Sequence, residues 1–289
     1  MSSTTIIALL KNYTKDERRL FMNSNLMANE KYSLKQIQEK LLVILLEFDR
    51  ICKKNNLKYS LDSGTLLGAI RHNGFIPWDD DVDVVMLRKD YKKFIRACKK
   101  DLNHDLFTLE TTKTSKYYSY NFGKLKMNNT IYEEKGSSKV KEHKGLFLDI
   151  FPLDNTSKIT YKIQYKLAYF WQTIRWNKIG REFSTSHKKI NSFFGKILPL
   201  KLVNFNAEFA LRFCNIFPTK NVCKLCHYGK GKKPHSRQFY TNIIEHTFEG
   251  EKFFVPKDYE TWLNMRYGDW KKLPPIEQQK PGHAIRIEL

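Results

Sequence analysis

Four aspartates within five positions form the densest group of chemically active side chains in this sequence, Asp79-Asp80-Asp81-Val82-Asp83. Val and Met residues follow the group and favour a β-strand, in which alternate side chains share one face. We therefore expect Asp79, Asp81 and Asp83 to project together. Carboxylates this close raise one another's pKa unless a cation neutralises them. Because clustered oxygen ligands suit Mg²⁺ or Mn²⁺, the segment predicts a metal site that substrate phosphates complete.

Two other interpretations of the acidic segment are a solvated turn, the commoner reason for an isolated run of Asp, and a calcium-binding loop. The calcium loop fits only at its first ligands. Val84 stands where that loop needs glycine, and Asp90 stands where it needs a bidentate Glu. The hydrophobic residues that follow the aspartates also favour the strand.

A candidate phosphate site lies upstream, at Asp62-Ser63-Gly64-Thr65. The segment has the pattern of a strand end followed by a helix start, and the backbone N–H groups at a helix N-terminus favour a phosphate. A helix cap would explain Ser63 or Thr65 equally well. The acidic strand that follows soon after strengthens the phosphate interpretation.

Positioning these groups requires a sheet with flanking helices, and the apolar pattern predicts both. Apolar residues recur every three or four positions from Leu34, which predicts a helix that ends near Lys54. Further helices are expected over 66–70 and 91–100, and strands over 59–62, 78–86, 117–126, 131–132 and 146–151, the last closed by Pro152. This mixture predicts an α+β fold over about 34–155.

The remainder of the chain is predicted to be helical first and mixed later. Apolar residues at helical spacing predict helices over 161–180 and 190–217, with a break at Pro199. A basic loop at 230–237 follows. The structural signals become clearer again at 248–256, and a helix is predicted over 258–267.

The charge balance is the most informative feature of the composition. The 289 residues include 51 Lys and Arg against 30 Asp and Glu, and the net charge of +21 predicts an anionic partner: nucleic acid, a membrane surface or phosphorylated substrates. Hydrophobic residues at 41% and aromatics at 14% exclude wholesale disorder. No apolar run approaches the roughly 20 residues of a membrane-spanning helix. An odd count of five cysteines and no basic leader at residues 1–11 predict a reducing, cytoplasmic location.

The longer string from Ser63 to Val84 resembles the LicD family of the nucleotidyltransferase superfamily. It reads Ser-Gly-Thr-Leu-Leu-Gly-Ala-Ile-Arg-His-Asn-Gly-Phe-Ile-Pro-Trp-Asp-Asp-Asp-Val-Asp-Val. The family comprises phosphotransferases of choline phosphate and related groups, kin to the fukutin-type ribitol-phosphate transferases. Further pieces that agree with the family are 122–126, 129–130, 145–154, 255–260, 267–269 and Pro274. The resemblance covers about 34–155 and 248–276, and it implies a nucleotidyltransferase-like mixed sheet with a mainly helical insertion or cap, whose residues 158–240 match nothing in the family.

The resemblance also implies roles for the carboxylates. Asp81 and Asp83 would hold the metal on the donor diphosphate, and Asp149 would be the third carboxylate of the superfamily. Asp149 would either complete the metal site or accept the proton of the acceptor hydroxyl. Asp79 shares the predicted strand face and is the alternative general base. A strand-end residue that caps a turn is the other interpretation of Asp149.

Substrate-binding residues are expected around the carboxylates, with Ser63, Gly64 and Thr65 at the phosphate. Arg71 and His72 would contact phosphate or form a surface helix end. Lys124 and Lys126 alternate on a strand and would hold phosphate or form a solvated face. A cage for a quaternary ammonium group would draw on Trp78, Tyr117, Tyr118 and Tyr120, although packing is the commoner role of such residues.

A structural zinc site is a weaker prediction. Cys223-Lys-Leu-Cys226 forms a CxxC pair, and Cys214, His227 and His235 are further ligands in reach along the chain. The spacing from Cys214 is unusual, and the family motif does not require zinc. Buried free cysteines are therefore the favoured interpretation.

Residues 158–240 hold most of the excess charge, with 17 Lys and Arg against 2 Asp and Glu. Aromatic residues stand among these cations, namely Tyr161, Tyr165, Tyr169, Phe170, Trp171 and Trp176. Such a mixture is typical of helices that lie in a membrane interface. A helical cap packed on the catalytic unit is the alternative, and the two roles are compatible.

We therefore predict four regions: an N-terminal segment (1–33), a nucleotidyltransferase-like catalytic core (34–157), a basic aromatic helical region (158–240) and a C-terminal segment that completes the catalytic domain (241–289).

The predicted function is metal-dependent transfer of phosphocholine, or a related alcohol phosphate, from CDP-choline to a hydroxyl of a cell-surface glycan or its lipid-linked precursor, with release of CMP. Mg²⁺ or Mn²⁺ would be the cofactor, and the enzyme would be peripheral at the inner face of the membrane. The alternatives are a nucleotidyltransferase acting on RNA or a small molecule, and a non-catalytic basic module that binds membrane or nucleic acid. The acidic cluster is compact and the rest of the chain is basic. This distribution favours a diphosphate donor and an anionic membrane or glycan as partners over nucleic acid.

Overall fold

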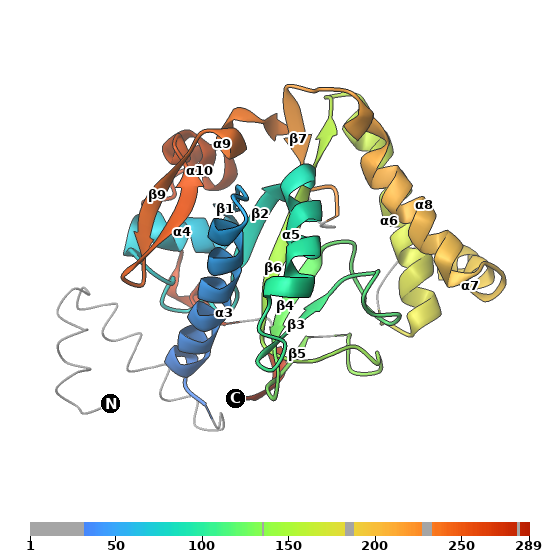
Figure 1. Ribbon diagram of the computed structural model, residues 1–289, viewed down its shortest axis with the longest axis horizontal. Coiled ribbons are helices and arrows are strands. Elements are labelled where there is room, and N and C mark those ends of the chain that lie inside the picture. The colour runs from blue at the N-terminus through green and yellow to red at the C-terminus, as the bar shows by residue number, and fades with distance from the viewer. Residues whose placement is uncertain (1–31, 135, 183–187, 227–232, 282–283) are drawn as a thin grey trace.

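A computed structural model describes residues 32–289 except 135, 183–187, 227–232 and 282–283 (Figure 1). Its main feature is a mixed sheet with strand order β1-β2-β6-β4-β3, which β7 and β8 extend from β6. The strands are β1 (Ser60–Leu61), β2 (Asp83–Leu87), β3 (Phe107–Glu110), β4 (Gly123–Met127), β6 (Phe147–Thr156), β7 (Asn221–Cys223) and β8 (His235–Ser236). Strands β2 and β6 are parallel, and the other pairs are antiparallel. This mixed sheet with helices confirms the predicted α+β class.

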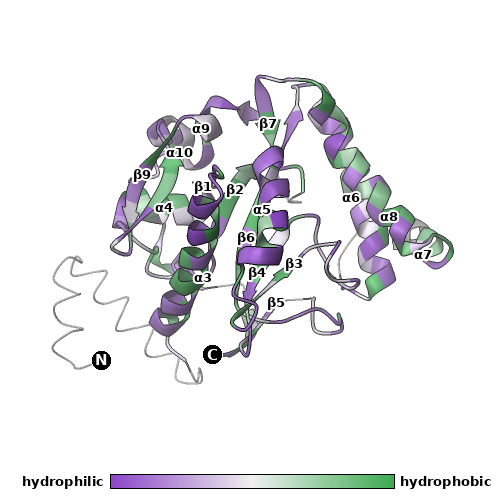
Figure 2. Cartoon of the chain, in the orientation of Figure 1, coloured by the Kyte–Doolittle hydropathy of each residue, from purple (hydrophilic) through white to green (hydrophobic). Residues whose placement is uncertain are grey.

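Two helices contribute to the larger core on one face of the sheet. The helix α3 (Leu34–Lys54) begins with a capping box between Ser33 and Gln36 and ends where its apolar period predicts. The helix α5 (Arg88–Asp101) packs against α3 and against β2 and β6. Their apolar sides meet strand residues such as Ile150. Polar residues cover the outer side of α5 (Figure 2).

A second helical layer contains α6 (Thr160–Ile179), α7 (Lys188–Ile197) and α8 (Leu200–Arg212). Pro199 separates the last two helices, as the sequence predicts. Side chains alternate along β2 and β6, so Val85 and Phe151 leave the larger core and join a second apolar cluster with Ala168 of α6 and Leu211 of α8. Figure 1 shows the three helices together at one end of the molecule. Among the described helices, none combines the length and the apolar character that crossing a bilayer requires.

The C-terminal segment returns to the larger core. It contains α9 (Gln238–Thr241), the hairpin of β9 (Ile243–Phe248) and β10 (Glu251–Pro256), and α10 (Tyr259–Tyr267), with 3₁₀ turns at Phe213–Ile216 and Ile276–Gln278 elsewhere in this half. Phe248, Phe253 and Trp262 lie in the larger core, and β9 contacts α4 (Ser63–His72). The last strand, β11 (Ala284–Glu288), pairs with β5 (Ile131–Glu134).

Several sequence predictions are wrong in detail. The strand expected over 78–86 begins only at Asp83, and the one expected over 117–126 begins only at Gly123. Pro152 does not close β6, because β4 pairs with that strand only as far as Ile150 and no antiparallel neighbour requires an N–H at Pro152. The strand β3 is absent from the prediction. The N-terminal segment lies outside the described residues except for its last two.

Candidate active site

Three charged side chains form one row across adjacent strands. Asp83 on β2 is the register partner of Asp149 on β6, which is the register partner of Lys124 on β4. Register partners project from the same side of a sheet, so the three side chains are neighbours. The Lys124 Nζ atom lies 2.9 Å from Asp149 Oδ1 and 3.3 Å from Glu134 Oε2. The row lies on the face of the sheet that carries the second apolar cluster.

Burial makes the two carboxyl groups of this row difficult to ionise together. Burial raises the pKa of Asp149 to about 7; Lys124 opposes this rise, and Asp83 and Glu134 add to it. Burial also raises the pKa of Asp83, against the opposing charge of Lys224. The carboxylate pair is therefore suited to take up a proton or a cation near neutral pH.

The turn before α4 is fastened to the start of β2. The Asp83 N–H donates to Thr65 Oγ1 at 2.9 Å, and the Asp62 N–H donates to the Asp83 carbonyl oxygen at 3.0 Å. Ser63, the first residue of α4, has a φ of 50°, in the left-handed region. Lys224 Nζ lies 2.5 Å from Asp62 Oδ2 and donates to Ser63 Oγ at 3.2 Å. Although burial opposes it, Lys224 lowers the pKa of Asp62, so the turn holds a buried ion pair.

The aspartates before β2 occupy different environments. A Cβ on Gly64 would lie 2.6 Å from Asp79 Oδ2, so only glycine leaves room for this carboxylate beside the turn. Asp80 is buried and accepts a hydrogen bond from Tyr132 Oη at 2.8 Å. Asp81 is half-buried. The shared strand face that the sequence predicts is wrong for the first three aspartates, because they precede β2 and the Asp79 N–H closes a turn to the Ile76 carbonyl oxygen.

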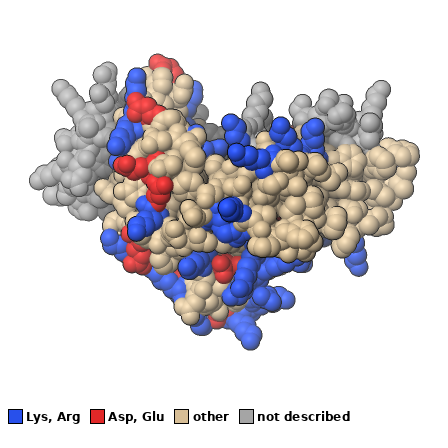
Figure 3. All heavy atoms as spheres, turned by 90° about the horizontal axis from the view of Figure 1, so that it is seen from above, with Lys and Arg blue, Asp and Glu red and all other residues tan. Residues whose placement is uncertain are grey.

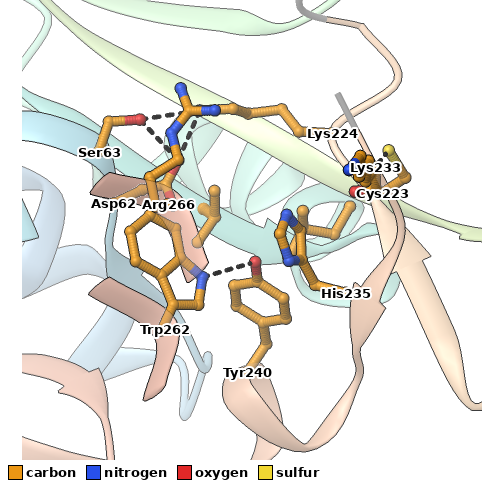
Figure 4. Close-up of a pocket in the computed structure, with 11 residues that line it drawn as sticks. Asp62, Ser63, Cys223, Lys224, Lys233, His235, Tyr240, Trp262 and Arg266 are labelled. Atoms are coloured by element: carbon orange, nitrogen blue, oxygen red, sulfur yellow. Dashed lines mark hydrogen bonds and ion pairs between the residues drawn. The ribbon is translucent and has the colours of Figure 1, made fainter. Parts of the chain in front are cut away.

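A small pocket opens beside the α4 turn (Figure 4). Its lining residues are Asp62, Ser63, Val85, Leu153, Cys223, Lys224, Lys233, His235, Tyr240, Trp262 and Arg266. They come from the α4 turn, the sheet, the 223–240 segment and α10, and Trp262 Nε1 donates to Tyr240 Oη at 3.2 Å. Lys224 and Arg266 lie close to the helix N-terminus and Lys233 lies beside Cys223 (Figure 4), so the pocket holds three cations, an arrangement that suits phosphate groups.

Comparison with known proteins shows the family of the chain. The chain matches the family described as LicD/FKTN/FKRP, nucleotidyltransferase domain, over residues 56–206. It is 32% identical over 269 residues to the lipopolysaccharide cholinephosphotransferase LicD of Haemophilus influenzae, an alignment that covers 88% of this chain and 97% of that protein. The chain belongs to the LicD family. Uncharacterized proteins of Rickettsia prowazekii and Rickettsia typhi are each 60% identical over 37 residues, 13% of this chain.

The extent of the LicD match corrects one sequence prediction. Residues 158–240 were expected to match nothing in the family, yet the family match runs to residue 206 and so includes α6 and α7. These helices carry little of the motif chemistry, since their described apolar residues either pack in the second cluster, as Ala168 does, or are exposed, as Phe193 and Ile197 are. Catalytic residue types alone therefore do not indicate that these helices belong to the family domain.

The Asp83–Asp149 pair offers ligand atoms that suit the Mg²⁺ or Mn²⁺ expected from the resemblance to LicD proteins. The two carboxylates are hard oxygen ligands at one register position, and a bound cation would offset the burial that raises both pKa values. Within the part of the chain that the structure describes, no three His, Cys, Asp or Glu side chains form a ready metal cluster. Asp81, the third predicted ligand beside this pair, lies in the loop before β2. The pair would therefore need substrate oxygens to complete a coordination shell.

The remaining predicted phosphate ligands lie in two places. Arg71 and His72 are at the opposite end of α4 from Ser63, roughly 12 Å away at 1.5 Å per residue. Arg71 donates to the carbonyl oxygen of residue 270 and to His72 Nε2, both at 2.9 Å. Lys126 is buried and forms an ion pair with Glu110 at 2.8 Å. Only Lys124 of the predicted cations is in the carboxylate row, and phosphate contacts of the others stay predictions.

The predicted aromatic cage residues are not gathered at one point. Trp78 packs on the larger core, Tyr118 is fully buried and Tyr117 is exposed. Tyr120 lies near the carboxylate row, with Lys124 Nζ 5.1 Å from its ring centroid. A choline-binding role therefore stays a prediction for Tyr120 and is not supported by a shared cage.

The cysteines are buried thiols. Cys223 and Cys226 each donate to a backbone carbonyl oxygen, at 3.6 and 3.8 Å. Burial raises the pKa of Cys226 to about 12, so its thiol keeps its proton, and Cys214 is also buried. His227 lies outside the described residues, and His235 lines the pocket beside α4.

Sequence reasoning missed Lys224 and Glu134 as site residues. Lys224 stands between the two cysteines of the CxxC pair, and the zinc interpretation obscured the better signal, a lone cation between apolar residues. Asp62 precedes the predicted phosphate turn, but nothing in the sequence pairs it with Lys224. Glu134 reaches Lys124 from β5, and no local pattern indicates that contact.

Proposed function

We propose that this LicD-family protein transfers phosphocholine, or a related alcohol phosphate, from a CDP-alcohol to a hydroxyl of a cell-surface glycan or its lipid-linked precursor, and releases CMP. The observation that carries the proposal is the Asp83–Asp149 register pair, in a chain that resembles a lipopolysaccharide cholinephosphotransferase over 88% of its length. Two buried cations, Lys124 and Lys224, flank the pair. Paired carboxylates with nearby cations suit phosphoryl transfer, in which negative charge spreads over the phosphate oxygens.

In the proposed reaction, the acceptor oxygen attacks the phosphorus that bears choline. The bond between that phosphorus and the bridging oxygen of CMP breaks, and CMP takes the electron pair. Asp149 is the proposed general base, since a pKa of about 7 lets its carboxylate accept the hydroxyl proton and pass it to solvent. Lys124 Nζ lies 2.9 Å from Asp149 Oδ1, and its positive charge favours loss of the proton from Asp149, which restores the carboxylate for the next reaction cycle. Asp79, whose carboxylate lies beside Gly64, is the alternative base.

The donor diphosphate is proposed to bind at the α4 turn. The backbone around Ser63 and Gly64, the Lys224 ammonium group and Arg266 on α10 surround the pocket there. Asp83, with Asp81 in the adjacent loop, would hold a divalent metal ion, and Asp149 would complete its ligands in the alternative in which Asp79 is the base. That ion would supply neutralisation of the charge on the diphosphate and its leaving group.

Ligand binding tests the donor assignment without an acceptor. A panel of CDP-choline, CDP-ethanolamine, CDP-ribitol and CDP-glycerol, each with Mg²⁺ or Mn²⁺, should contain one compound that raises the melting temperature, because a ligand that binds only the folded state stabilises it. Asp83→Asn should reduce the shift. A melting temperature that responds to nucleoside triphosphates and to none of the CDP-alcohols would favour nucleotidyl transfer instead.

We also propose that the second helical layer contacts an anionic membrane surface. Along α6, two exposed lysines each precede an exposed apolar residue, Lys162-Ile163 and Lys166-Leu167, and Lys158-Ile159 repeats the pattern in the turn just before the helix. The four-residue spacing keeps both stripes on one side of the helix. Phe205 and Phe209 on α8 are 64% and 59% exposed. Apolar side chains beside cations fit an interface that combines acyl chains with anionic headgroups.

The exposed apolar residues differ from those that the sequence singles out. Trp176 donates to the Ser119 carbonyl oxygen at 2.7 Å, and Tyr161, Tyr165 and Trp171 pack against the second apolar cluster. These aromatics therefore support the cap interpretation. Figure 3 shows the helical end of the molecule as a mainly uncharged surface with Lys and Arg at its borders, and no described Asp or Glu is visible there on that face.

A further inference from the structure

A stripe of cations runs along one side of α5. Arg88, Lys92, Arg96 and Lys99 are spaced by three or four residues, which places them above one another on the helix. All four line a cavity of about 510 Å³. The intervening cations Lys93 and Lys100 do not line it. Arg88 is buried, whereas Lys92, Arg96 and Lys99 are exposed, so the stripe borders an open groove.

Two other segments close this groove with similar chemistry. The 111–114 loop contributes three threonines and Lys113, and α8 contributes Arg212. The lining thus holds six basic side chains and one carboxylate, Glu208. Glu208 pairs with Arg212 at 2.5 Å and lies 3.8 Å from Lys113. One carboxylate shared between two cations leaves the groove with a large positive surplus.

The cations of the groove lack sufficient counter-charge. Burial lowers the pKa of Lys92, and Arg212, Arg88 and Lys113 lower it further, against the opposing effect of Glu208. Arg212 Nε is buried without a hydrogen-bond partner among the described residues. Arg88 alone is fully compensated, by the buried Asp154 at 2.7 and 2.5 Å. A bound anion would relieve this repulsion and provide an acceptor for the remaining donors.

The groove and the carboxylate row lie at opposite ends of β2. Asp83 begins the strand, and Arg88 follows its last residue, so the two sites are separated by roughly 13 Å along the strand. Phe122 lines the groove and directly precedes β4, which carries Lys124 of the row. The groove therefore extends from Arg88 to the neighbourhood of the row, where Lys124 Nζ lies 5.8 Å from the Phe122 ring centroid, and this span suits an extended ligand of a few sugar units.

We propose that this groove binds a phosphorylated part of the acceptor glycan while the receiving hydroxyl lies at the Asp83–Asp149 pair. Calling the ligand an acceptor rests on the proposed phosphotransferase function. The anion-binding site itself does not depend on that function. Asp154 and Glu208 offset two of the six basic charges, and two phosphate groups would match the remaining surplus of four better than a neutral or singly charged sugar.

Kinetics with a matched pair of double variants tests the acceptor role. The variant Lys92→Glu/Arg96→Glu reverses two groove charges, and Lys93→Glu/Lys100→Glu makes the same change on the side of α5 away from the groove. With lipopolysaccharide-derived oligosaccharide as acceptor, the first variant should raise the acceptor KM about tenfold or more and leave the CDP-choline KM unchanged. Alkaline phosphatase removes phosphate groups from the acceptor. The treated acceptor should have a raised KM with the wild-type protein, and its KM with Lys92→Glu/Arg96→Glu should equal that of the untreated acceptor with the same variant. Equal acceptor KM values for both double variants would overturn the proposal.

Calorimetric titration of inorganic pyrophosphate keeps the test independent of turnover. If the protein releases no CMP from any CDP-alcohol, the proposed function fails, but pyrophosphate should still bind the wild type and Lys93→Glu/Lys100→Glu more tightly than Lys92→Glu/Arg96→Glu. Equal affinities across the three proteins would refute the anion site. Weaker pyrophosphate binding combined with an unchanged acceptor KM would refute the acceptor assignment.

Discussion

Asp83 of β2 and Asp149 of β6 are register partners on two parallel strands, and burial raises the pKa of both. Neither strand alone brings two carboxylates together, because Asp154 of β6 pairs with Arg88 and the other aspartates of the acidic segment precede β2. The parallel pairing of β2 and β6 creates the pair, and β4 adds Lys124 from the other side. The candidate active site is therefore a product of strand order.

Removing either charge of this pair should abolish most of the activity and spare the fold. Asp83→Asn and Asp149→Asn should each lower kcat/KM for CMP release by about 10²- to 10⁴-fold, because a ligand or the general base is lost. Asp83→Asn removes a like charge beside Asp149, so its urea midpoint should not fall. Asp149→Asn should lower the midpoint, because buried Lys124 loses the nearer of its two described carboxylate partners. Asp105→Asn, at an exposed position, is the control. Near wild-type activity in both site variants would contradict the assignment.

Breaking the Asp62–Lys224 pair should be costly to stability. Lys224→Met leaves a buried carboxylate without its partner, and the free energy of unfolding should fall by about 3 kcal/mol. The double variant Asp62→Asn/Lys224→Met should recover part of the loss, because no buried charge is left unpaired. Urea denaturation of the three proteins measures this. A double variant no more stable than Lys224→Met would show that the ion pair is not the cause.

The stability difference between wild type and Lys224→Met should depend on pH. The pKa of Asp62 is lowered in the folded protein, so its contribution is present above the unfolded value of about 3.9 and is lost as pH falls through the folded pKa. The pKa of Lys224 is raised, so its contribution is present below about 10.4 and is lost as pH rises through the folded pKa. The difference should be greatest between about pH 5 and 9. A difference that does not change down to pH 3 would argue against a charged pair.

Two glycines of α4 should respond differently to alanine. At Gly64 the new Cβ meets the movable carboxylate of Asp79, whereas at Gly68 it would lie 2.5 Å from the Gly74 backbone oxygen. Gly64→Ala should therefore lower kcat/KM with little change in melting temperature, and Gly68→Ala should mainly lower the melting temperature. Combined kinetics and thermal unfolding separate the two effects. Equal loss of stability in both would mean that Asp79 is as rigid as the backbone.

Membrane contact should depend on the exposed α8 phenylalanines. Phe205→Ser/Phe209→Ser should reduce co-flotation with vesicles of phosphatidylglycerol and phosphatidylcholine, while the protein stays folded, because these side chains are largely exposed. Val43→Ser on α3, also an exposed apolar position, is the control. Flotation that is unchanged in the double variant, or equal on vesicles of phosphatidylcholine alone, would remove the membrane proposal.

Local patterns predict the elements of this fold better than their pairing. The apolar period predicts α3 to its last residue, and Pro199 predicts the break between α7 and α8, because both signals act within one helix. The aspartates before β2 show the limit, since alternation places them on a strand that in fact begins at Asp83. The turn that Asp79 closes to Ile76 and the hydrogen bond from Tyr132 to Asp80 determine that region, and the second is a tertiary contact that no local pattern indicates.

The candidate site shows the same limit. Asp83 and Asp149 are predictable as chemical types within a family motif, and the structure makes them register partners. Lys224 could not be assigned, because its partner Asp62 lies far away in sequence and its neighbours suggest a different chemistry. Residue types thus indicate the reaction class, whereas the buried cations that set the electrostatics depend on long-range packing.

The most direct test of the central claim follows the phosphorus atom next to choline. Wild-type protein is incubated with CDP-choline labelled at that phosphorus, a divalent metal and a lipopolysaccharide-derived acceptor, and the products are separated. The account predicts label on the acceptor with one CMP released per transfer, and loss of both in Asp83→Asn. Cytidine attached to the acceptor, or undiminished transfer by Asp83→Asn, would contradict it.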